Sequence, residues 1–430
     1  MTPSTAPYMP EHSFNRLGIA PRILDILAKL NFTTPTPIQY RAIPEGVAGK
    51  DVVGVAQTGT GKTLAFGIPL LQRLSGSEGR GLILVPTREL ALQVDETLSK
   101  IARPLGIRTV VFIGGASMGM QISALRRDPH IVIATPGRLL DHLAQKTIRL
   151  DKVEVLVLDE ADRMLDMGFW PQVKRIIAAA PANRQTMLFS ATLSRDIMQL
   201  ATQHMKLPLR IEVAPAGTTV EKVSQEFFIV RKEDKPRLLE KILGDYKGST
   251  LVFSRTKHGA KRIMRTVLGM GHTAAEIHGN RSLSQRREAL EGFKNGRYRV
   301  LVATDIASRG IDVKGIELVV NYDLPMDSAD YVHRIGRTAR AGAEGRAISF
   351  AEPHQKRDIR DIERLIRKTV PISVLPALPP ARAQSQSYVD DDRPRRFSRS
   401  PQRSSSPRSG SGFRGRGGPP RRGAPRRFSR

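Results

Sequence analysis

The residues best suited to chemistry are a lysine and a threonine that close a glycine-rich loop. The loop reads Ala56-Gln57-Thr58-Gly59-Thr60-Gly61-Lys62-Thr63, between an apolar run that predicts a strand and a pattern that predicts a helix. Small residues let backbone N–H groups approach phosphate oxygens, and a helix N-terminus adds a favourable dipole. Lys62 could then reach the β- and γ-phosphates of a nucleotide, and Thr63 could hold Mg²⁺. A chance glycine-rich turn is the alternative, which the strand–loop–helix context disfavours, although Ala56 replaces the glycine that usually opens the pattern.

Two adjacent carboxylates are the second candidate for chemistry. Asp159-Glu160-Ala161-Asp162 follows the strongly apolar run Val155–Leu158 and lies 97 residues beyond Lys62 (159 − 62). Open α/β sheets carry their chemistry at the carboxyl ends of strands. Asp159 suits a Mg²⁺ ligand there, and Glu160 suits a base that orients and deprotonates a water molecule. Such a pair taken alone is usually a solvated turn or a helix cap, but the loop upstream favours the catalytic interpretation.

The elements that position these residues alternate along the chain. Short apolar, β-branched runs separated by amphipathic stretches are typical of parallel sheets covered by helices. The first half predicts strands at Asp51–Ala56, Leu82–Pro86, Thr109–Ile113, Ile131–Ala134, Val155–Leu158 and Thr186–Phe189, with helices at Glu89–Ala102 and Gly137–Leu143. The second half predicts strands at Phe227–Val230, Thr250–Phe253, Ala274–Ile277, Val300–Ala303, Leu318–Asn321 and Ala347–Ala351, with helices at Lys235–Leu243 and Ser284–Phe293. The expected fold class is therefore α/β, with two parallel-sheet domains.

These patterns divide the chain into four segments. We expect a first domain at residues 1–213, a linker at 214–222, a second domain at 223–370 and a tail at 371–430. From Ala381 to Arg430 there are 14 Arg, no Lys and 3 Asp, a net charge of +11. A segment this rich in Arg, Ser, Gly and Pro buries too little apolar surface to offset chain entropy, so we expect the tail to be disordered.

The charge balance points to a polyanionic partner. The 430 residues include 69 Lys and Arg against 41 Asp and Glu, a formal net charge of +28. A membrane surface is the competing polyanion, but no apolar run approaches the roughly 20 residues of a spanning helix. Met1–Pro10 also lack the pattern of a secretory signal. Nucleic acid is therefore the favoured partner.

The numbers of cysteine and histidine residues limit the kinds of catalytic and metal site that the chain can form. The chain has no cysteine, which excludes disulfides, thiolate metal sites and thiol nucleophiles, and its 9 histidines are scattered. A cytoplasmic location is expected from the same observation. In the tail, Phe397, Phe413 and Phe428 stand among arginines, which suits stacking on nucleic-acid bases; a purely solubilising tail is the alternative.

With the two motifs in place, the chain resembles the DEAD-box family of ATP-dependent RNA helicases, in superfamily 2. The resemblance runs from about Phe14 to about Ala351, with the family's motifs in order. Phe14 and Pro35-Thr-Pro-Ile-Gln39 resemble the Q motif, which implies that Gln39 reads the adenine edge and that Phe32 stacks on the base, although Asn31 replaces a common glycine. The resemblance implies two RecA-like domains, ATP and Mg²⁺ as ligands, and a nucleotide site that includes the loop from Ala56 to Thr63 with Gly310 and Asp312.

The family's RNA-contacting elements have counterparts in both halves. In the first half they are Pro86-Thr87-Arg88-Glu89-Leu90, Gly114-Gly115 and Thr135-Pro136-Gly137-Arg138, each at the end of an expected strand. In the second half they include Ser254, Thr304 and Arg286, with Leu283 where the family's Gln-x-x-Arg element has glutamine. Ser190-Ala191-Thr192 resembles the element that contacts Asp162, the last DEAD aspartate, and couples hydrolysis to unwinding.

His333-Arg-Ile-Gly-Arg-Thr-Ala-Arg340 resembles the family's arginine-finger motif. Arg337 and Arg340, three residues apart, would lie on one helical face. The resemblance makes them fingers that reach the γ-phosphate from the second domain, and it gives His333 a structural or interdomain role. A basic helix face for RNA is the alternative. Ala339 stands where glycine is common.

The resemblance implies RNA-stimulated ATP hydrolysis by two lobes that close on ATP and RNA, with local, non-processive unwinding of short duplexes and remodelling of RNA–protein complexes. The expected partner is RNA, single-stranded or in short duplexes, with little sequence specificity, and the core is expected to be monomeric. One core with a short basic tail most resembles the bacterial RhlE-type subgroup. Two rival functions remain: a related DNA-directed helicase, and an ATP-regulated RNA clamp or chaperone with little productive unwinding.

Overall fold

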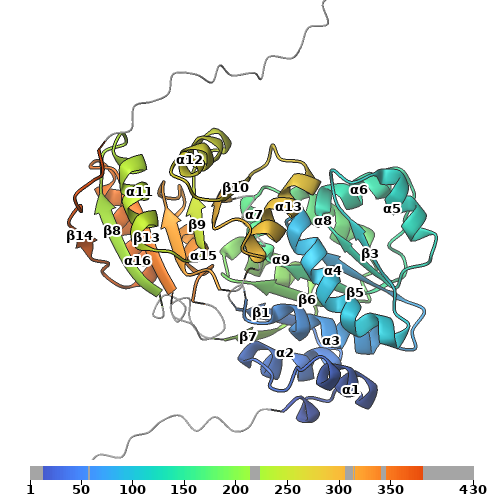
Figure 1. Ribbon diagram of the computed structural model, residues 1–430. Coiled ribbons are helices and arrows are strands. Elements are labelled where there is room, and N and C mark those ends of the chain that lie inside the picture. The colour runs from blue at the N-terminus through green and yellow to red at the C-terminus, as the bar shows by residue number, and fades with distance from the viewer. Residues whose placement is uncertain are drawn as a thin grey trace, which may run out of the picture. The chain divides into compact units, whose positions relative to one another are not determined.

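Two parallel sheets of seven strands each form the framework of the protein (Figure 1). The computed structural model describes residues 13–56, 59–213, 223–305, 313, 315–339 and 345–380. The strand order is β3-β4-β2-β5-β6-β1-β7 in the first sheet and β10-β11-β9-β12-β13-β8-β14 in the second. The second sheet therefore repeats the order of the first, with every strand number raised by seven. The two predicted α/β domains are thus two copies of one topology.

The first domain contains the strands β1 (Val52–Val55), β2 (Arg80–Leu84), β3 (Thr109–Phe112), β4 (Ile131–Ala134), β5 (Val153–Asp159), β6 (Gln185–Ser190) and β7 (Leu209–Glu212). Its helices are η1 (Phe14–Arg16), α1 (Pro21–Lys29), α2 (Pro37–Val47), α3 (Lys62–Leu74), α4 (Arg88–Ala102), η2 (Arg103–Leu105), α5 (Met118–Leu125), α6 (Pro136–Ala144), α7 (Ala161–Asp166), α8 (Trp170–Ala179) and α9 (Arg195–His204).

The second domain contains the strands β8 (Val223–Ile229), β9 (Thr250–Phe253), β10 (Ala274–Ile277), β11 (Val300–Ala303), β12 (Leu318–Asn321), β13 (Gly345–Ala351) and β14 (Ile372–Ser373). Its helices are α11 (Lys235–Asp245), α12 (Lys257–Gly269), α13 (Leu283–Lys294), α15 (Ser328–Ile335) and α16 (Lys356–Ile366).

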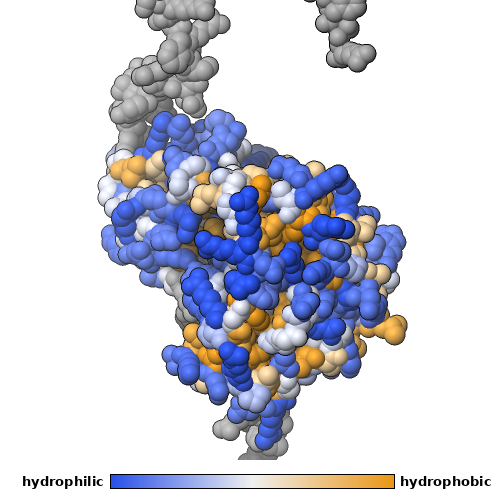
Figure 2. Space-filling model, turned by 90° about the vertical axis from the view of Figure 1, so that its right-hand side faces the viewer, coloured by the Kyte–Doolittle hydropathy of each residue, from blue (hydrophilic) through white to orange (hydrophobic). Residues whose placement is uncertain are grey.

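Both sheets are buried on their two faces, which explains why their strands are continuous apolar runs. In β5, Val155 and Val157 belong to one hydrophobic cluster, whereas Leu156 and Leu158 belong to the cluster on the other face. Hydrophilic side chains cover most of the face shown in Figure 2, with hydrophobic ones in smaller patches. None of the described helices has the length and apolar character needed to cross a membrane.

Every strand and helix predicted from the sequence overlaps an element of the structure, but two edge strands were not predicted. β7 carries Arg and Glu and is mostly exposed, and β14 has only two residues, so neither forms an apolar run. The tail expected from residue 371 is wrong in its first ten residues, because β14 pairs with β8 and the carbonyl of Pro379 accepts a hydrogen bond from Arg237 at 2.6 Å. The expected linker at 214–222 and the tail from 381 onward lie outside the described residues.

Candidate functional site

The glycine-rich loop joins β1 to α3 with backbone angles that favour glycine. Gly59 and Gly61 have φ of +86° and +88°. Lys62, the first residue of α3, is 6% exposed, and its Nζ donates a hydrogen bond to the carbonyl oxygen of Ala56 at 3.0 Å. The lysine is thus held over the loop by a backbone carbonyl that a phosphate oxygen could replace. Thr60 and Thr63 are half-buried, and Gln57 and Thr58 lie outside the described residues.

Gln39 connects this loop to α2. Its side-chain oxygen accepts a hydrogen bond from the backbone N–H of Thr36 at 2.9 Å, and its amide nitrogen donates to the carbonyl of Gly61 at 3.0 Å. A Cβ at Gly61 would lie 2.3 Å from Nε2 of Gln39. Glycine is therefore required at position 61 both for its conformation and for space. An amide has two N–H groups and two lone pairs, so these two bonds use half of its hydrogen-bonding capacity.

The two aromatic residues expected near the base differ in exposure. Phe14 is 4% exposed and packs in a hydrophobic cluster of the first domain, whereas Phe32, between α1 and α2, is 37% exposed. Stacking on a base is therefore open to Phe32. Phe14 packs in the core of the first domain, and its part in nucleotide binding stays a prediction.

Asp159 and Glu160 are buried at the carboxyl end of β5, 3% and 4% exposed. Burial raises the pKa of Asp159 to about 7, against an opposing effect of Lys62. Burial also raises the pKa of Glu160, but Arg163, Lys62 and Arg337 together outweigh it and hold this pKa below its usual value. Glu160 therefore stays ionised, as a base must, whereas Asp159 carries a carboxylate that a bound cation would stabilise.

Glu160 also has an unusual backbone conformation. Its φ of +53° and ψ of +52° lie in the left-handed region, which costs a non-glycine residue about 1–2 kcal/mol. Its Oε2 lies 3.7 Å from Nε of Arg163, and both side chains are almost fully buried. Strain of this kind persists only where surrounding contacts impose it, and it concentrates at functional sites.

Asp162 and the Ser190–Thr192 segment are brought together as expected. One carboxylate oxygen of Asp162, Oδ2, accepts hydrogen bonds from the backbone N–H groups of Ala191 and Thr192 at 2.9 Å each, and from the Thr192 hydroxyl at 3.2 Å. The backbone N–H of Asp162 in turn donates to the Ser190 hydroxyl at 3.3 Å. The carboxyl ends of β5 and β6 are therefore joined by a charge-assisted network, and a role of this network in coupling stays a prediction.

The second domain brings a histidine and an arginine into electrostatic range of Glu160. Arg337 is 3% exposed and donates through Nε to the carbonyl of His333 at 3.2 Å. Burial, followed by the charges of Arg163 and Arg337, holds the pKa of His333 well below its usual value. His333 is therefore neutral, which suits a structural role better than proton transfer. Arg340, Gly310 and Asp312 lie outside the described residues.

Arg334, in α15, is a residue of this motif that sequence reasoning missed. It is 2% exposed and makes two bonds to Asp305, Nε to Oδ1 at 2.5 Å and Nη2 to Oδ2 at 2.7 Å. Its guanidinium also lies 5.0 Å over the Phe253 ring and donates to the carbonyl of Asp323 at 2.6 Å. Arg334 thus fixes α15 to the carboxyl ends of β9, β11 and β12. Its only sequence signal is its place between His333 and Arg337.

The residues expected to contact RNA in the first domain follow β2, β3 and β4, which are neighbours in the sheet. Thr87 and Thr135 are the N-caps of α4 and α6. A Cβ at Gly115 would lie 2.3 Å from Nη1 of Arg88, so the guanidinium lies directly on the glycine pair. The structure brings to this edge Pro86, Thr87, Arg88, Gly114, Gly115, Thr135 and Arg138, whose Nη1 donates to the carbonyl of Ala116 at 3.0 Å.

In the second domain Ser254 and Thr304 directly follow β9 and β11, which are also neighbours. Ser254 is fully buried, and its hydroxyl lies 3.4 Å from both the Thr256 carbonyl and Oδ2 of Asp323. Thr304 is half-buried. The buried Ser254 hydroxyl therefore holds neighbouring residues of this edge in place, and Thr304 is the more solvent-accessible of the two.

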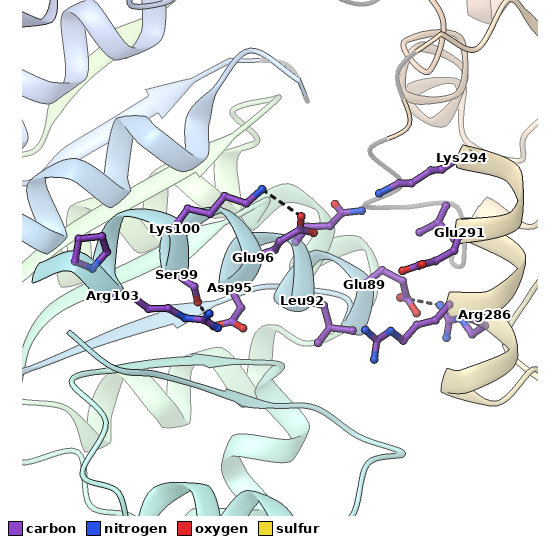
Figure 3. Close-up of a pocket in the computed structure, with 14 residues that line it drawn as sticks. Glu89, Leu92, Asp95, Glu96, Ser99, Lys100, Arg103, Arg286, Glu291 and Lys294 are labelled. Atoms are coloured by element: carbon purple, nitrogen blue, oxygen red, sulfur yellow. Dashed lines mark hydrogen bonds and ion pairs between the residues drawn. The ribbon is translucent and has the colours of Figure 1, made fainter. Parts of the chain in front are cut away.

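Arg286, for which the family resemblance implies phosphate binding, forms an ion pair in the structure, and its contact with RNA stays a prediction. It lies in α13 and pairs with Glu89 of α4 in the first domain, with 2.8 Å between Nη2 and Oε2 (Figure 3). The two side chains border a groove between α4 and α13 that is also lined by Asp95, Lys100, Glu291 and Lys294. Glu89 was missed by sequence reasoning, because a carboxylate inside an RNA-contacting element gives no signal of a partner 197 residues away (286 − 89).

Asp159 and Thr63 are suited to a Mg²⁺ ion whose other ligands are phosphate oxygens and water. Among the described residues no group of three or more His, Asp or Glu could hold a metal ion. Mg²⁺ is typically bound by one or two protein oxygens with nucleotide phosphates and water. Asp159, whose buried carboxylate has a raised pKa, and the half-buried hydroxyl of Thr63 supply that number of donors.

Comparison with known proteins agrees with this arrangement. Residues 36–200 match the DEAD/DEAH box helicase family, and residues 234–342 match the helicase conserved C-terminal domain. The chain is 42% identical over 359 residues to the ATP-dependent RNA helicase CshA of Listeria monocytogenes, covering 83% of this chain and 69% of that protein. It is 44% identical over 356 residues to the ATP-dependent RNA helicase DbpA of Bacillus subtilis, covering 82% and 74%.

Solved structures share the fold. S. cerevisiae Dbp5 bound to RNA and ADP BeF3 superimposes with a TM-score of 0.76 at 31% identity, covering 84% of this chain and 95% of that one. The two domains of repeated topology are therefore RecA-like, and the matched regions include the phosphate-binding loop, the paired carboxylates and Arg337. The chain belongs to the DEAD-box family of ATP-dependent RNA helicases.

Proposed function

We propose that this chain couples RNA-stimulated ATP hydrolysis to local separation of short RNA duplexes. The observation that supports this most strongly is the setting of Glu160, whose charge is stabilised by Arg163 and Lys62 of its own domain and by Arg337 of the other. A hydrolytic site with charged groups from two domains is complete only while those domains lie together. Ligands that bring them together therefore stimulate hydrolysis, and ATP and RNA assist each other's binding.

The catalytic roles follow from charge and position. Lys62 exchanges its bond to the Ala56 carbonyl for the β- and γ-phosphate oxygens, while ionised Glu160 orients the attacking water and accepts its proton. Arg337, with Arg340, stabilises negative charge that develops on the transferred phosphoryl group. Mg²⁺, held by Thr63 and Asp159, would neutralise phosphate charge. Gln39 and Phe32 select and stack the adenine.

RNA binding is assigned to the carboxyl edges of the two sheets. N-cap threonines, the glycine pair and the guanidinium groups of Arg88 and Arg138 suit phosphate and sugar contacts, which carry little sequence information. The contacts between Asp162 and Thr192 would transmit the state of the nucleotide to this edge. A grip on one strand's backbone would then separate a short helix locally.

The named relatives support these assignments. CshA and DbpA are ATP-dependent RNA helicases, and Dbp5 was solved with RNA and ADP BeF3. We extend ATP and RNA binding to this chain on that basis. A monomeric core, a cytoplasmic location and an RhlE-type subgroup remain predictions.

Phosphate release with and without single-stranded RNA tests the proposal, using wild type, Glu160→Gln and the control Glu96→Gln. Glu96 lies on α4 with its side chain 65% exposed, so its variant changes the same charge away from the site. We expect strong RNA stimulation in wild type and control and none in Glu160→Gln. Stimulation by matched DNA alone would make the substrate DNA. Tight RNA binding without stimulation would replace the helicase assignment with an RNA clamp or chaperone.

A further inference from the structure

The outer face of α12 carries cations and no acid. Residues 257–269 include four cations and His258 but no Asp or Glu. Ala260, Ile263 and Val267 are buried against the sheet. At about 100° per residue, Lys261, Arg262 and Arg265 fall on the opposite side of the helix, with Lys257 at the flank of that side.

This composition is not a consequence of the protein's general positive charge. Helix α16 also has four cations, Lys356, Arg357, Arg360 and Arg364, but it intersperses them with three acids. Two of its arginines, Arg357 and Arg364, are paired with Asp361. Helix α12 therefore carries no acid within its own sequence, whereas α16 carries three acids among its cations.

The basic face begins at the edge assigned to RNA. Thr256 caps α12 two residues after Ser254, and Nζ of Lys257 lies 3.2 Å from Oδ1 of Asn280, which follows β10. Because β9 and β10 belong to one parallel sheet, the helix that connects them runs back toward the amino ends of the strands, packed against β10 and β11. From Lys257 to Arg265 the rise is about 12 Å, the length of about three phosphates of one helical strand.

We propose that this α12 face, defined by Lys257, Lys261, Arg262 and Arg265, binds the sugar–phosphate backbone of RNA that extends beyond the helicase edge. The proposal rests on the proposed function, because it takes the edge at Ser254 and Thr304 as the place where RNA lies. An acidic protein surface would also match the charges, but the continuity of the face with that edge favours RNA. Lysine and arginine contacts to phosphate give affinity without sequence specificity.

The face predicts a dependence of affinity on RNA length. We take an RNA of about six nucleotides, about 20 Å at about 3.4 Å per phosphate, as the probe for the helicase edge alone, and one of about twenty nucleotides as the probe that extends past it. Each phosphate neutralised on a single strand adds about 0.7 to the slope of log affinity against log salt. The longer RNA is therefore bound more tightly and with a steeper salt dependence.

The test uses the full chain and the paired reversal Lys261→Glu/Arg265→Glu. The matched control is Lys356→Glu/Arg360→Glu, which has the same spacing and charge change on α16. Binding of fluorescent 6- and 20-nucleotide RNAs is measured by anisotropy with a non-hydrolysable ATP analogue over a range of salt. The milder pair Lys261→Gln/Arg265→Gln, with melting temperatures of all variants, separates loss of charge from loss of folding.

We expect the reversal to weaken binding of the 20-nucleotide RNA by about tenfold and to flatten its salt slope by about 1.4. Binding of the 6-nucleotide RNA and its maximal stimulation of ATP hydrolysis should stay unchanged, as should every property of the control. Equal losses for both RNAs, or equal losses in the α16 control, would overturn the α12 proposal. If no RNA stimulates hydrolysis in wild type, the proposed function fails instead, and the length dependence of binding still decides whether α12 contacts RNA.

Discussion

The carboxylate of Glu89 and the guanidinium of Arg286 form an ion pair that crosses from the first domain to the second. Their Oε2 and Nη2 atoms are 2.8 Å apart, and the side chains are 5% and 9% exposed. Burial raises the pKa of Glu89, and the charge of Arg286 opposes that shift. A buried pair stabilises a structure only while both charges are present, because either charge alone is left desolvated. The pair therefore links α4, at the edge proposed to bind RNA, to α13 of the other domain.

Removing one partner of this pair should cost more than removing both. Glu89→Gln and Arg286→Met should each raise the RNA concentration needed for half-maximal ATPase stimulation by about tenfold, because closure then buries an unpaired group. The double variant should lose less than either single variant, which requires a coupling above about 1.4 kcal/mol, the free energy of one tenfold effect. Strict additivity would show that the two side chains do not interact when RNA is bound.

Gly61 should tolerate no side chain. Gly61→Ala places a Cβ against the Gln39 amide and imposes φ of +88° on alanine, so we expect ATP affinity to fall by more than tenfold. Gly76 provides the control, because its φ is +93° and a Cβ there meets nothing within 4 Å. Gly76→Ala carries the backbone cost alone, about 1–2 kcal/mol of stability, and should leave ATP affinity unchanged. Equal ATP affinities in the two variants would show that the contact between Gln39 and the loop does not matter for ATP binding.

The sequence predicted those parts of the site that depend on patterns of neighbouring residues. The apolar run of β5 identifies a buried strand, and the carboxyl end of such a strand places Asp159 and Glu160 without further information. The edge strand β7 could not be found in this way, because exposed positions at a sheet edge accept Arg and Glu. Local patterns also say little about which charges pair across the fold.

Arg334 and Glu89 show this limit. Both are buried charges whose partners, Asp305 and Arg286, come from other elements, and each pairing depends on how strands and domains are arranged. The burial of Phe14 has the same origin, since its ring packs in the core of the domain.

The contact between Asp162 and Thr192 predicts a graded loss of coupling. Thr192→Val removes the hydroxyl bond of 3.2 Å but keeps both backbone donors. We therefore expect the free-energy barrier to unwinding to rise by about 1 kcal/mol, with little change in ATP hydrolysis. Asp162→Asn weakens all three bonds and should uncouple unwinding more severely. Duplex separation per ATP hydrolysed is the measurement. Thr202→Val, which removes a hydroxyl bonded within α9, is the control and should behave as wild type.

The environment of His142 should make the folding stability of the protein decrease at acidic pH. It is buried, stacked on Phe112 and in hydrogen-bond range of Thr147 and Gln121, and burial lowers its pKa. The unfolded chain therefore takes up a proton near pH 6.5 that the folded chain does not. The stabilisation is fully present above that pH and is lost as the pH falls below it.

Urea unfolding from pH 7.5 to pH 5 checks this prediction. His142→Gln should be less stable at pH 7.5, and its stability should fall less steeply on acidification, by up to one proton in the linkage slope. An unchanged slope would mean that other histidines carry the pH dependence.

Arg337 gives the most direct test of the account's central claim, that two domains complete one hydrolytic site. ATP hydrolysis is followed in a single turnover at saturating RNA for wild type and Arg337→Gln, with ATP affinity measured separately. The account predicts a rate loss of about 10³ with ATP affinity changed only a few-fold, because the arginine acts on transition-state charge. An unchanged rate would contradict the account and place the complete ATPase site in the first domain alone.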